Sequence, residues 1–119
     1  MRKKSLCFDI DNTICSTTGN QYKKAKPKKK IIKIINHLFD LGHEINIFTA
    51  RYMGRNKNNI LQAKKDGYKF TKKQLENWGV KYNGLFFGKP SADFYLDDKS
   101  FNFNKKLVNK FLLKLIKKN

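Results

Sequence analysis

Four short apolar runs, separated by longer polar or amphipathic segments, constrain the fold more than any other feature of the sequence. They cover residues 5–10, 45–48, 85–87 and 94–96. Short apolar runs without helical spacing, bounded by turn residues, are typical of buried strands. Strands that alternate with helices favour a parallel sheet, in which right-handed crossovers place helices on both faces. We therefore expect a three-layer, Rossmann-like α/β fold with a parallel sheet of about four strands.

Two further segments carry the apolar periodicity of helices. Over residues 28–41 apolar side chains recur at helical spacing, and Gly42 follows as a natural stop. Over residues 104–118 apolar side chains occupy one side and lysines the other. A basic amphipathic helix can bind a membrane surface. A chain of alternating strands and helices needs a last helix to cover its sheet, so we favour packing against the sheet.

The segment between the second and third expected strands predicts two short helices. One lies near residues 60–65. The other covers residues 71–78, with Thr71 as its N-cap and Gly79 as its terminator. Trp78 lies on the apolar face of this helix, so we expect it in the core rather than as a stacking platform.

The length of 119 residues and the mass of 14.0 kDa predict a single domain over residues 1–119. The sequence shows neither a membrane span nor a secretion signal. Cys7 and Cys15 make neither a zinc site nor a disulfide framework, so we expect two reduced thiols in a cytoplasmic protein. His37 and His43 lack a second ligand at metal spacing and are expected to be structural or exposed.

Polar residues gather where the expected strands end. The set comprises Asp9, Asp11, Thr49, Lys89, Asp97 and Asp98. The carboxyl ends of parallel strands meet at one edge of a sheet, so we expect these side chains to converge there. Carboxylates without a usable His or Cys make an all-oxygen site, which suits Mg²⁺ before Ca²⁺ when phosphate is also bound. The lysine would neutralise one phosphoryl oxygen and the threonine hydroxyl would hydrogen-bond another. One carboxylate can then attack phosphorus, which splits the displacement into two easier steps through an aspartyl phosphate.

Asp9 and Asp11 lie two residues apart, and residues at that spacing in a strand face the same side. If the extended conformation persisted that far, both carboxylates would address one small ligand. Two like charges held close together need a cation or a shared proton.

The sequence resembles the haloacid dehalogenase superfamily of phosphotransferases at four motifs that occur in the right order. Residues 8–13 (FDIDNT) resemble the first motif, residues 48–51 (FTAR) the second, Lys89 the third and residues 96–98 (LDD) the fourth. The longer run over residues 88–99 is similar to a small subgroup of capsule or polysaccharide biosynthesis phosphatases. The resemblance implies the HAD-like form of the Rossmann-like fold.

The resemblance also implies separate roles for the two carboxylates of the first motif. Asp9 is the nucleophile that becomes phosphorylated. Asp11 is the general acid that protonates the leaving oxygen and then the general base that activates water. Their side chains therefore need not point the same way.

The remaining site residues are implied by the other motifs. Thr49, Ala50 and Lys89 are expected to bind phosphate, and Mg²⁺ is expected to be held by Asp9, the backbone carbonyl of Asp11 and one of Asp97 or Asp98. We favour Asp98 as the direct ligand and Asp97 as its support. Arg51 is a candidate for substrate binding, or alternatively a surface arginine bonded to the loop.

The superfamily usually carries a cap domain over the site, and this chain has little room for one. Residues 12–26 and 52–82 are the segments that could cover the site, so we expect a minimal cap. Such a site either accepts a large substrate or borrows a lid from a neighbouring subunit, which makes a homo-oligomer a reasonable hypothesis.

The leading function is therefore that of a Mg²⁺-dependent phosphatase acting on a sugar phosphate of surface polysaccharide synthesis or a similar metabolite. A nucleic-acid or nucleotide end-processing phosphatase is the alternative that the net charge of +18 supports. We favour it less because three of the 27 basic residues are arginines, and the abundance of Lys, Asn and Ile suggests a biased composition. A non-catalytic anion-binding module on the same fold is the third alternative.

Overall fold

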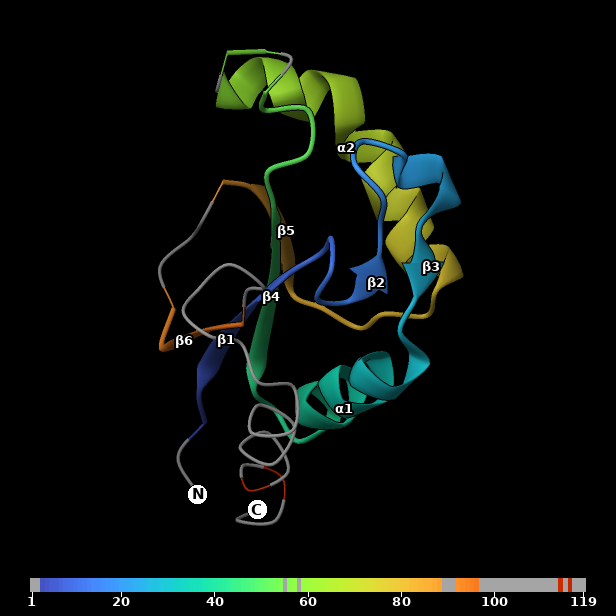
Figure 1. The fold of residues 1–119 in the computed structure, drawn as a ribbon. Coiled ribbons are helices and arrows are strands. Elements are labelled where there is room, and N and C mark those ends of the chain that lie inside the picture. The colour runs from blue at the N-terminus through green and yellow to red at the C-terminus, as the bar shows by residue number, and fades with distance from the viewer. Residues whose placement is uncertain are drawn as a thin grey trace.

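The computed structural model describes residues 3–54, 56–57, 59–88, 92–96, 114 and 116 of the chain. Its main sheet has four parallel strands in the order β5-β4-β1-β6 (Figure 1). They are β1 (Ser5–Asp9), β4 (Glu44–Thr49), β5 (Gly84–Phe87) and β6 (Phe94–Leu96). Each strand coincides with one of the four apolar runs, so the expected α/β fold with a four-stranded parallel sheet is confirmed.

The register of the sheet aligns the carboxyl ends of its strands. Asp9 at the end of β1 pairs with Phe48, the residue before Thr49. Thr49 at the end of β4 pairs with Phe87, and its carbonyl accepts a hydrogen bond of 3.1 Å from the Gly88 N–H. The polar residues that follow β1 and β4 therefore start from adjacent points on one edge.

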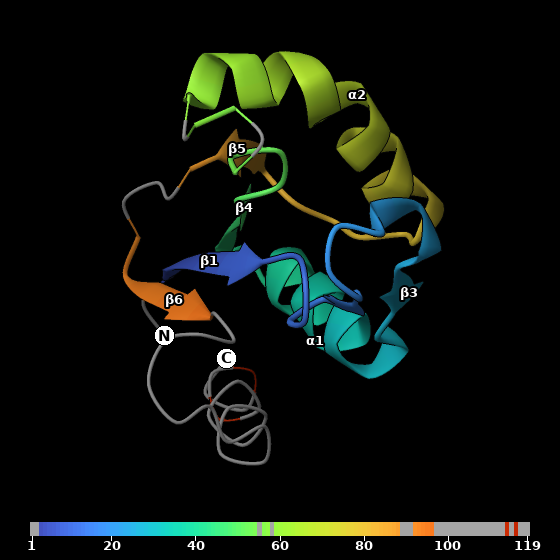
Figure 2. The same cartoon turned by 45° about the horizontal axis from the view of Figure 1, so that its top comes forward.

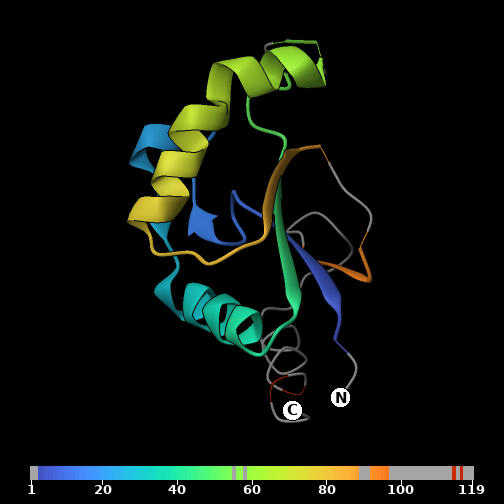
Figure 3. The ribbon, with the colours of Figure 1, turned by 180° about the vertical axis from the view of Figure 1, so that it is seen from behind.

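The first helix, α1 (Lys29–Asp40), follows the expectation for residues 28–41. Its buried side chains are Ile32, Ile34, Ile35 and Leu38. The helix ends at Leu41, and Gly42 takes a positive φ of 96° that allows the chain to turn into β4. The chain moves from β1 to β4 to β5 in one direction, so right-handed crossovers place α1 and α2 (Ile60–Asn77) on the same face of the sheet (Figure 3).

The prediction of two short helices between β4 and β5 is wrong, because α2 is one continuous helix of 18 residues. Asn59 is its N-cap, and the Asn59 side chain accepts a hydrogen bond of 3.1 Å from the Gln62 N–H. Thr71, expected as a cap, is fully buried in the middle of the helix. The terminator is as expected, since Gly79 has a φ of 73°. Trp78 also lies where expected, packed against the core.

A close contact explains the glycine in the middle of α2, Gly67. Gly67 faces Tyr52, and a Cβ atom built on Gly67 would lie 2.2 Å from two carbons of the Tyr52 ring. Glycine is needed at this position for the approach of the ring, and it does not break the helix. The buried stripe of α2 runs straight through it at intervals of four residues, over Ala63, Gly67, Thr71 and Leu75.

Residues 11–27, which we call the flap, connect β1 to α1 at the carboxyl edge of the sheet (Figure 2). The sequence predicts a loop here. The structure adds a short antiparallel pair, β2 (Cys15–Ser16) with β3 (Lys26–Pro27), and a 3₁₀ turn over Tyr22–Lys24. These elements give the flap a defined path over the site.

Of the two histidines, which we expect to be structural or exposed, one is exposed and the other is buried. His37 is exposed on α1. His43 is buried, and its Nδ1 accepts a hydrogen bond of 3.0 Å from the Lys4 N–H. Burial, followed by the charge of Lys3, lowers the pKa of His43, so the neutral imidazole is the form that fits this position.

The last expected helix, over residues 104–118, falls almost entirely outside the described residues. Lys114 and Ile116 are described, both are helical, and Ile116 packs against the core. In the part of the chain that the structure describes, no helix has the length and apolar character needed to cross a membrane.

Candidate active site

The site begins where β1 ends. Asp9 is the last residue of the strand and is half-buried, and its Oδ1 accepts a hydrogen bond of 2.9 Å from the Ile10 N–H. The chain then turns sharply, because the Ile10 carbonyl accepts hydrogen bonds from the N–H groups of Thr13, Ile14 and Cys15. This turn takes Asp11 out of the strand direction.

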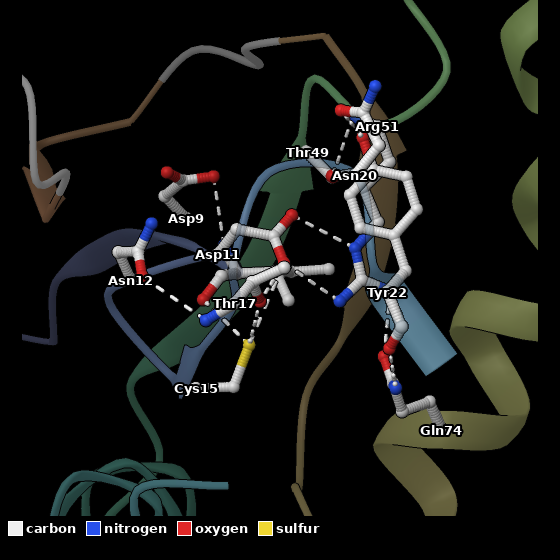
Figure 4. A network of polar contacts seen from close by, with 11 residues as sticks. Asp9, Asp11, Asn12, Cys15, Thr17, Asn20, Tyr22, Thr49, Arg51 and Gln74 are labelled. Atoms are coloured by element: carbon white, nitrogen blue, oxygen red, sulfur yellow. Dashed lines mark hydrogen bonds and ion pairs between the residues drawn. The ribbon is translucent and has the colours of Figure 1, made fainter. Parts of the chain in front are cut away.

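The extended conformation therefore does not reach Asp11, and the two carboxylates do not share one strand face. Figure 4 shows the carboxylate of Asp11 directed at Arg51, while that of Asp9 lies apart from it. Asn12 takes a left-handed φ of 65° directly after Asp11, which completes the change of direction.

Asp11 forms a bidentate ion pair with Arg51. Arg51 Nε donates to Asp11 Oδ2 and Arg51 Nη2 donates to Asp11 Oδ1, each over 2.9 Å. Thr17, from the flap, donates its hydroxyl proton to Asp11 Oδ1 over 2.6 Å. Two parallel charge-assisted bonds fix the plane of the carboxylate as well as its charge environment.

Arg51 is buried to 1% exposure, so the alternative of a surface arginine is wrong. Its Nη1 donates to Gln74 Oε1 on α2 over 2.7 Å, and its guanidinium lies 4.7 Å from the centre of the Tyr22 ring. A cation over an aromatic face is attracted by the ring quadrupole. Nε, Nη1 and Nη2 of Arg51 all donate to acceptors within the protein, and its role in substrate binding stays a prediction.

The last residue of β4 and the residue after it differ in their exposure. Thr49 is buried, and its Oγ1 accepts a hydrogen bond of 3.0 Å from the Arg51 N–H, so it helps to fix the backbone of Arg51. The Thr49 hydroxyl keeps its own proton to donate. Ala50, the next residue, is exposed.

A cavity of about 260 Å³ opens between the end of β1, the flap and the end of β4. It is lined by Asp9, Asp11, Asn12, Gly19, Tyr22, Ala50 and Arg51. Four residues that the sequence assigns to the site thus share one cavity, and Thr49 bonds to the backbone of one of them, Arg51. The other three, Lys89, Asp97 and Asp98, lie outside the described residues. The residues that precede them end at the same edge, where Gly88 bonds to Thr49 and Leu96 pairs with Phe8.

The carboxylate and carbonyl oxygens at the cavity are ligands of the kind that hard cations prefer. Asp9 contributes a half-buried carboxylate, whereas both carboxylate oxygens of Asp11 already accept hydrogen bonds. This fits the expectation that Asp11 would offer a metal its backbone carbonyl rather than its side chain. Within the described ranges, which omit Asp97 and Asp98, no three His, Cys, Asp or Glu side chains lie together in a way that could hold a metal ion.

Neighbouring groups stay protonated. Burial raises the pKa of the Cys15 thiol, whose Sγ lies 3.7 Å from Asp11 Oδ1. Burial likewise raises the pKa of the Tyr22 phenol. Both groups are therefore neutral donors beside the ion pair at neutral pH.

Three polar residues of the site have no signal in the sequence that marks them as functional. Thr17 and Tyr22 belong to a segment that is uniformly polar. Gln74 sits beside the buried stripe of α2, where a polar residue on a helix is ordinary. Their place in the site becomes visible in the contacts of the buried Arg51 and its partner Asp11, which connect the flap, the end of β4 and α2.

The solved structures that resemble this chain include two proteins from bacteria. A crystal structure of a target protein from Vibrio cholerae is 25% identical, covers 93% of this chain and 98% of that chain, and has a TM-score of 0.69. A conserved protein from Bacteroides thetaiotaomicron is 14% identical, covers 95% of this chain and 91% of that chain, and has a TM-score of 0.58. The likeness over nearly the whole chain supports the Rossmann-like α/β fold. No protein-family model and no curated protein matches the sequence.

Proposed function

We propose that this chain is a Mg²⁺-dependent phosphomonoester hydrolase of the haloacid dehalogenase superfamily that acts through an aspartyl phosphate on Asp9. The observation that carries the proposal is the arrangement of two carboxylates at one cavity. Asp9 ends the interior strand β1, and Asp11 is turned away from it and held by Arg51. Two carboxylates in different surroundings suit two different roles. The proposed superfamily rests on the resemblance of the four sequence motifs and on their order.

In the first step an oxygen of Asp9 attacks phosphorus, and the bond from phosphorus to the ester oxygen breaks. Asp11 enters this step protonated, not as the carboxylate that pairs with Arg51 in the structure, and the leaving oxygen takes this proton. In the second step Asp11 removes a proton from water, the water oxygen attacks phosphorus, and the bond to Asp9 breaks. Phosphate leaves, and both carboxyl groups return to their starting state.

The hydrogen bonds of Asp11 suggest which of its atoms carries the proton. Oδ1 accepts from both Arg51 and Thr17, whereas Oδ2 accepts one hydrogen bond from the described residues, that of Arg51 Nε. A carboxylate oxygen has room for two such partners. We therefore assign the transferred proton to Oδ2, with Oδ1 as the anchored oxygen.

Mg²⁺ would be held by Asp9, the backbone carbonyl of Asp11 and Asp98, with Asp97 in support. When bound, it would neutralise charge on the phosphoryl group. Ala50, which lines the cavity, together with Thr49 and Lys89 would bind the phosphoryl oxygens. The proposal places this reaction in the cytoplasm, on a sugar phosphate or similar metabolite.

A nucleic-acid end-processing phosphatase is the second candidate, and the net charge of +18 favours it. The same charge would attract any anionic substrate. A panel of phosphorylated sugars, nucleotides and 3′- or 5′-phosphorylated oligonucleotides, ranked by kcat/KM, separates the two candidates.

The proposal is tested by phosphate release from an aryl phosphate with Mg²⁺ and with a chelator. We expect activity that the chelator removes and added Mg²⁺ restores. Asp9→Asn should lower kcat by about a thousandfold or more, because the nucleophile is lost. Asp40→Asn is the matched control, since Asp40 lies on the exposed face of α1 and pairs with Lys81. Equal activity in Asp9→Asn and the control would contradict the proposal.

The short flap leaves open how the site is covered. A homo-oligomer that lends a lid is part of the proposal. Gel filtration that showed a strict monomer at working concentration would remove that part and leave the chemistry untouched.

A further inference from the structure

Gln74 joins three parts of the site that are distant in sequence. Its Oε1 accepts a hydrogen bond of 2.7 Å from Nη1 of Arg51, a residue that follows β4. Its Nε2 donates a hydrogen bond of 2.7 Å to the carbonyl of Tyr22, in the flap. Figure 4 shows Gln74 below the Arg51 side chain, on the far side from Asp11. One side-chain amide of α2 therefore bonds to both the arginine and the flap.

The geometry of a guanidinium makes this contact directional. The group is planar and presents five N–H bonds in a fixed fork. With Nε and Nη2 directed at Asp11, Nη1 must point elsewhere, and Gln74 accepts from it. The Tyr22 ring lies against one face of the same plane. The orientation of Arg51 is thus set from three sides.

Loss of the amide would change that orientation. Arg51 is buried, so an Nη1 donor without an acceptor would cost free energy. The guanidinium could rotate to bring Nη1 to another acceptor, but this rotation would break its bonds to Asp11. Loss of the bond to Tyr22 would also release the flap, which carries Thr17, the other donor to Asp11. Both effects act on the same carboxylate.

We propose that Gln74 is a positioning residue for Asp11, acting through Arg51 and the flap. The inference rests on the proposed function, because it assigns Gln74 to the proton-transfer step of that reaction. Gln74 does not itself line the cavity; it bonds to two residues that do, Arg51 and Tyr22. It sets the angle at which Asp11 Oδ2 meets the leaving oxygen, and a positioned acid matters most when the leaving group is poor.

The dependence on leaving group distinguishes positioning from a merely structural role. We compare kcat/KM for glycerol phosphate, whose alkoxide needs a proton, with kcat/KM for dinitrophenyl phosphate, whose phenolate leaves without one. In a two-step reaction kcat/KM reports attack on the ester and is independent of the later water step. A distorted site would lower both values by a similar factor.

The test variant is Gln74→Met, which keeps the size of the side chain and removes both hydrogen bonds. We expect kcat/KM for glycerol phosphate to fall by about tenfold to a hundredfold, with a change of less than about twofold for dinitrophenyl phosphate. Gln74→Asn, which shortens the amide, should show the same selective loss and serves as the second variant if Gln74→Met does not fold. Gln74→Glu keeps an acceptor for Arg51 but loses the donor to the Tyr22 carbonyl, so it should recover a part of the loss.

The matched control is Gln62→Met, because Gln62 lies on α2 with an exposed side chain that bonds to Asp66. It should leave both substrates unchanged. In an Asp11→Asn background, Gln74→Met should lower kcat/KM by less than about twofold further, since the two residues act in one step.

The outcomes separate the two proposals. A wild type without phosphatase activity would overturn the proposed function, and this inference with it. An active wild type in which Gln74→Met and Gln74→Asn lose equally on the two substrates, or lose nothing, would overturn this inference alone. A full additional loss in the Asp11→Asn background would do the same.

Discussion

Removing the guanidinium of Arg51 should cost far more stability than removing a charge from a surface ion pair. Arg51→Met leaves Asp11 without two hydrogen bonds of 2.9 Å and leaves Gln74 Oε1 without its donor. Breaking a buried pair by deleting one partner typically costs about 3–5 kcal/mol. The Asp11 side chain is 23% exposed, so water can replace part of what it loses. We therefore expect a loss of about 2–4 kcal/mol.

The assay is urea unfolding followed by far-UV circular dichroism, with the free energy compared between variants. Lys81→Met is the matched control, because its ion pair with Asp40 has a similar distance of 2.8 Å but side chains that are 49% and 57% exposed. That control should lose less than about 1 kcal/mol. If Arg51→Met does not fold, Arg51→Lys takes its place, since it keeps the charge and loses the bidentate geometry. A loss for the Arg51 variant no larger than that of Lys81→Met would refute the reasoning.

Three further outcomes follow from the structure. Gly67→Ala should destabilise the protein by about 1–3 kcal/mol, because its Cβ would meet the Tyr52 ring at 2.2 Å, although Ala favours helices; a raised melting temperature would contradict this. His43 has a lowered pKa, so its contribution is fully present above the unfolded pKa of about 6.5 and is lost as pH falls from there through the folded pKa. Urea unfolding between neutral pH and about pH 5 should show this loss, and it should shrink in His43→Gln; identical pH profiles would speak against it. The net charge of +18 should make kcat/KM for a small phosphomonoester fall as salt is added, and a flat salt profile would show that the charge does not steer substrate.

The strands and the first helix are predictable from the sequence because local signals determine them. Each strand is an apolar run bounded by polar residues, and α1 has the periodicity and the terminating glycine of a helix. The position of Asp9 at a strand end follows from the same local pattern. These features need no knowledge of distant contacts.

The continuity of α2 and the burial of Arg51 depend on contacts between distant segments. Gly67 lowers the local helix propensity. A glycine is needed at this position because the ring of Tyr52, in the loop after β4, packs against it. Arg51 is buried because Asp11 and Gln74 provide partners 40 and 23 residues away. A single sequence carries no sign of either contact, since an arginine after a strand is usually exposed.

The direction of Asp11 depends on a local turn rather than on distant contacts. Its spacing from Asp9 predicts a shared strand face, and the turn after Ile10 removes it from that face. The turn depends on three N–H groups that meet one carbonyl, a geometry that residue types alone do not determine.

The stereochemical course at phosphorus tests the central claim most directly. A phosphorothioate monoester that carries two different oxygen isotopes on phosphorus is hydrolysed by the wild-type protein with Mg²⁺ in water of the third oxygen isotope, and the configuration of the released thiophosphate is determined. Each in-line displacement inverts phosphorus, so attack by Asp9 followed by attack of water gives net retention. We expect retention. Net inversion would show that water attacks the ester in a single step, and it would contradict an aspartyl phosphate on Asp9.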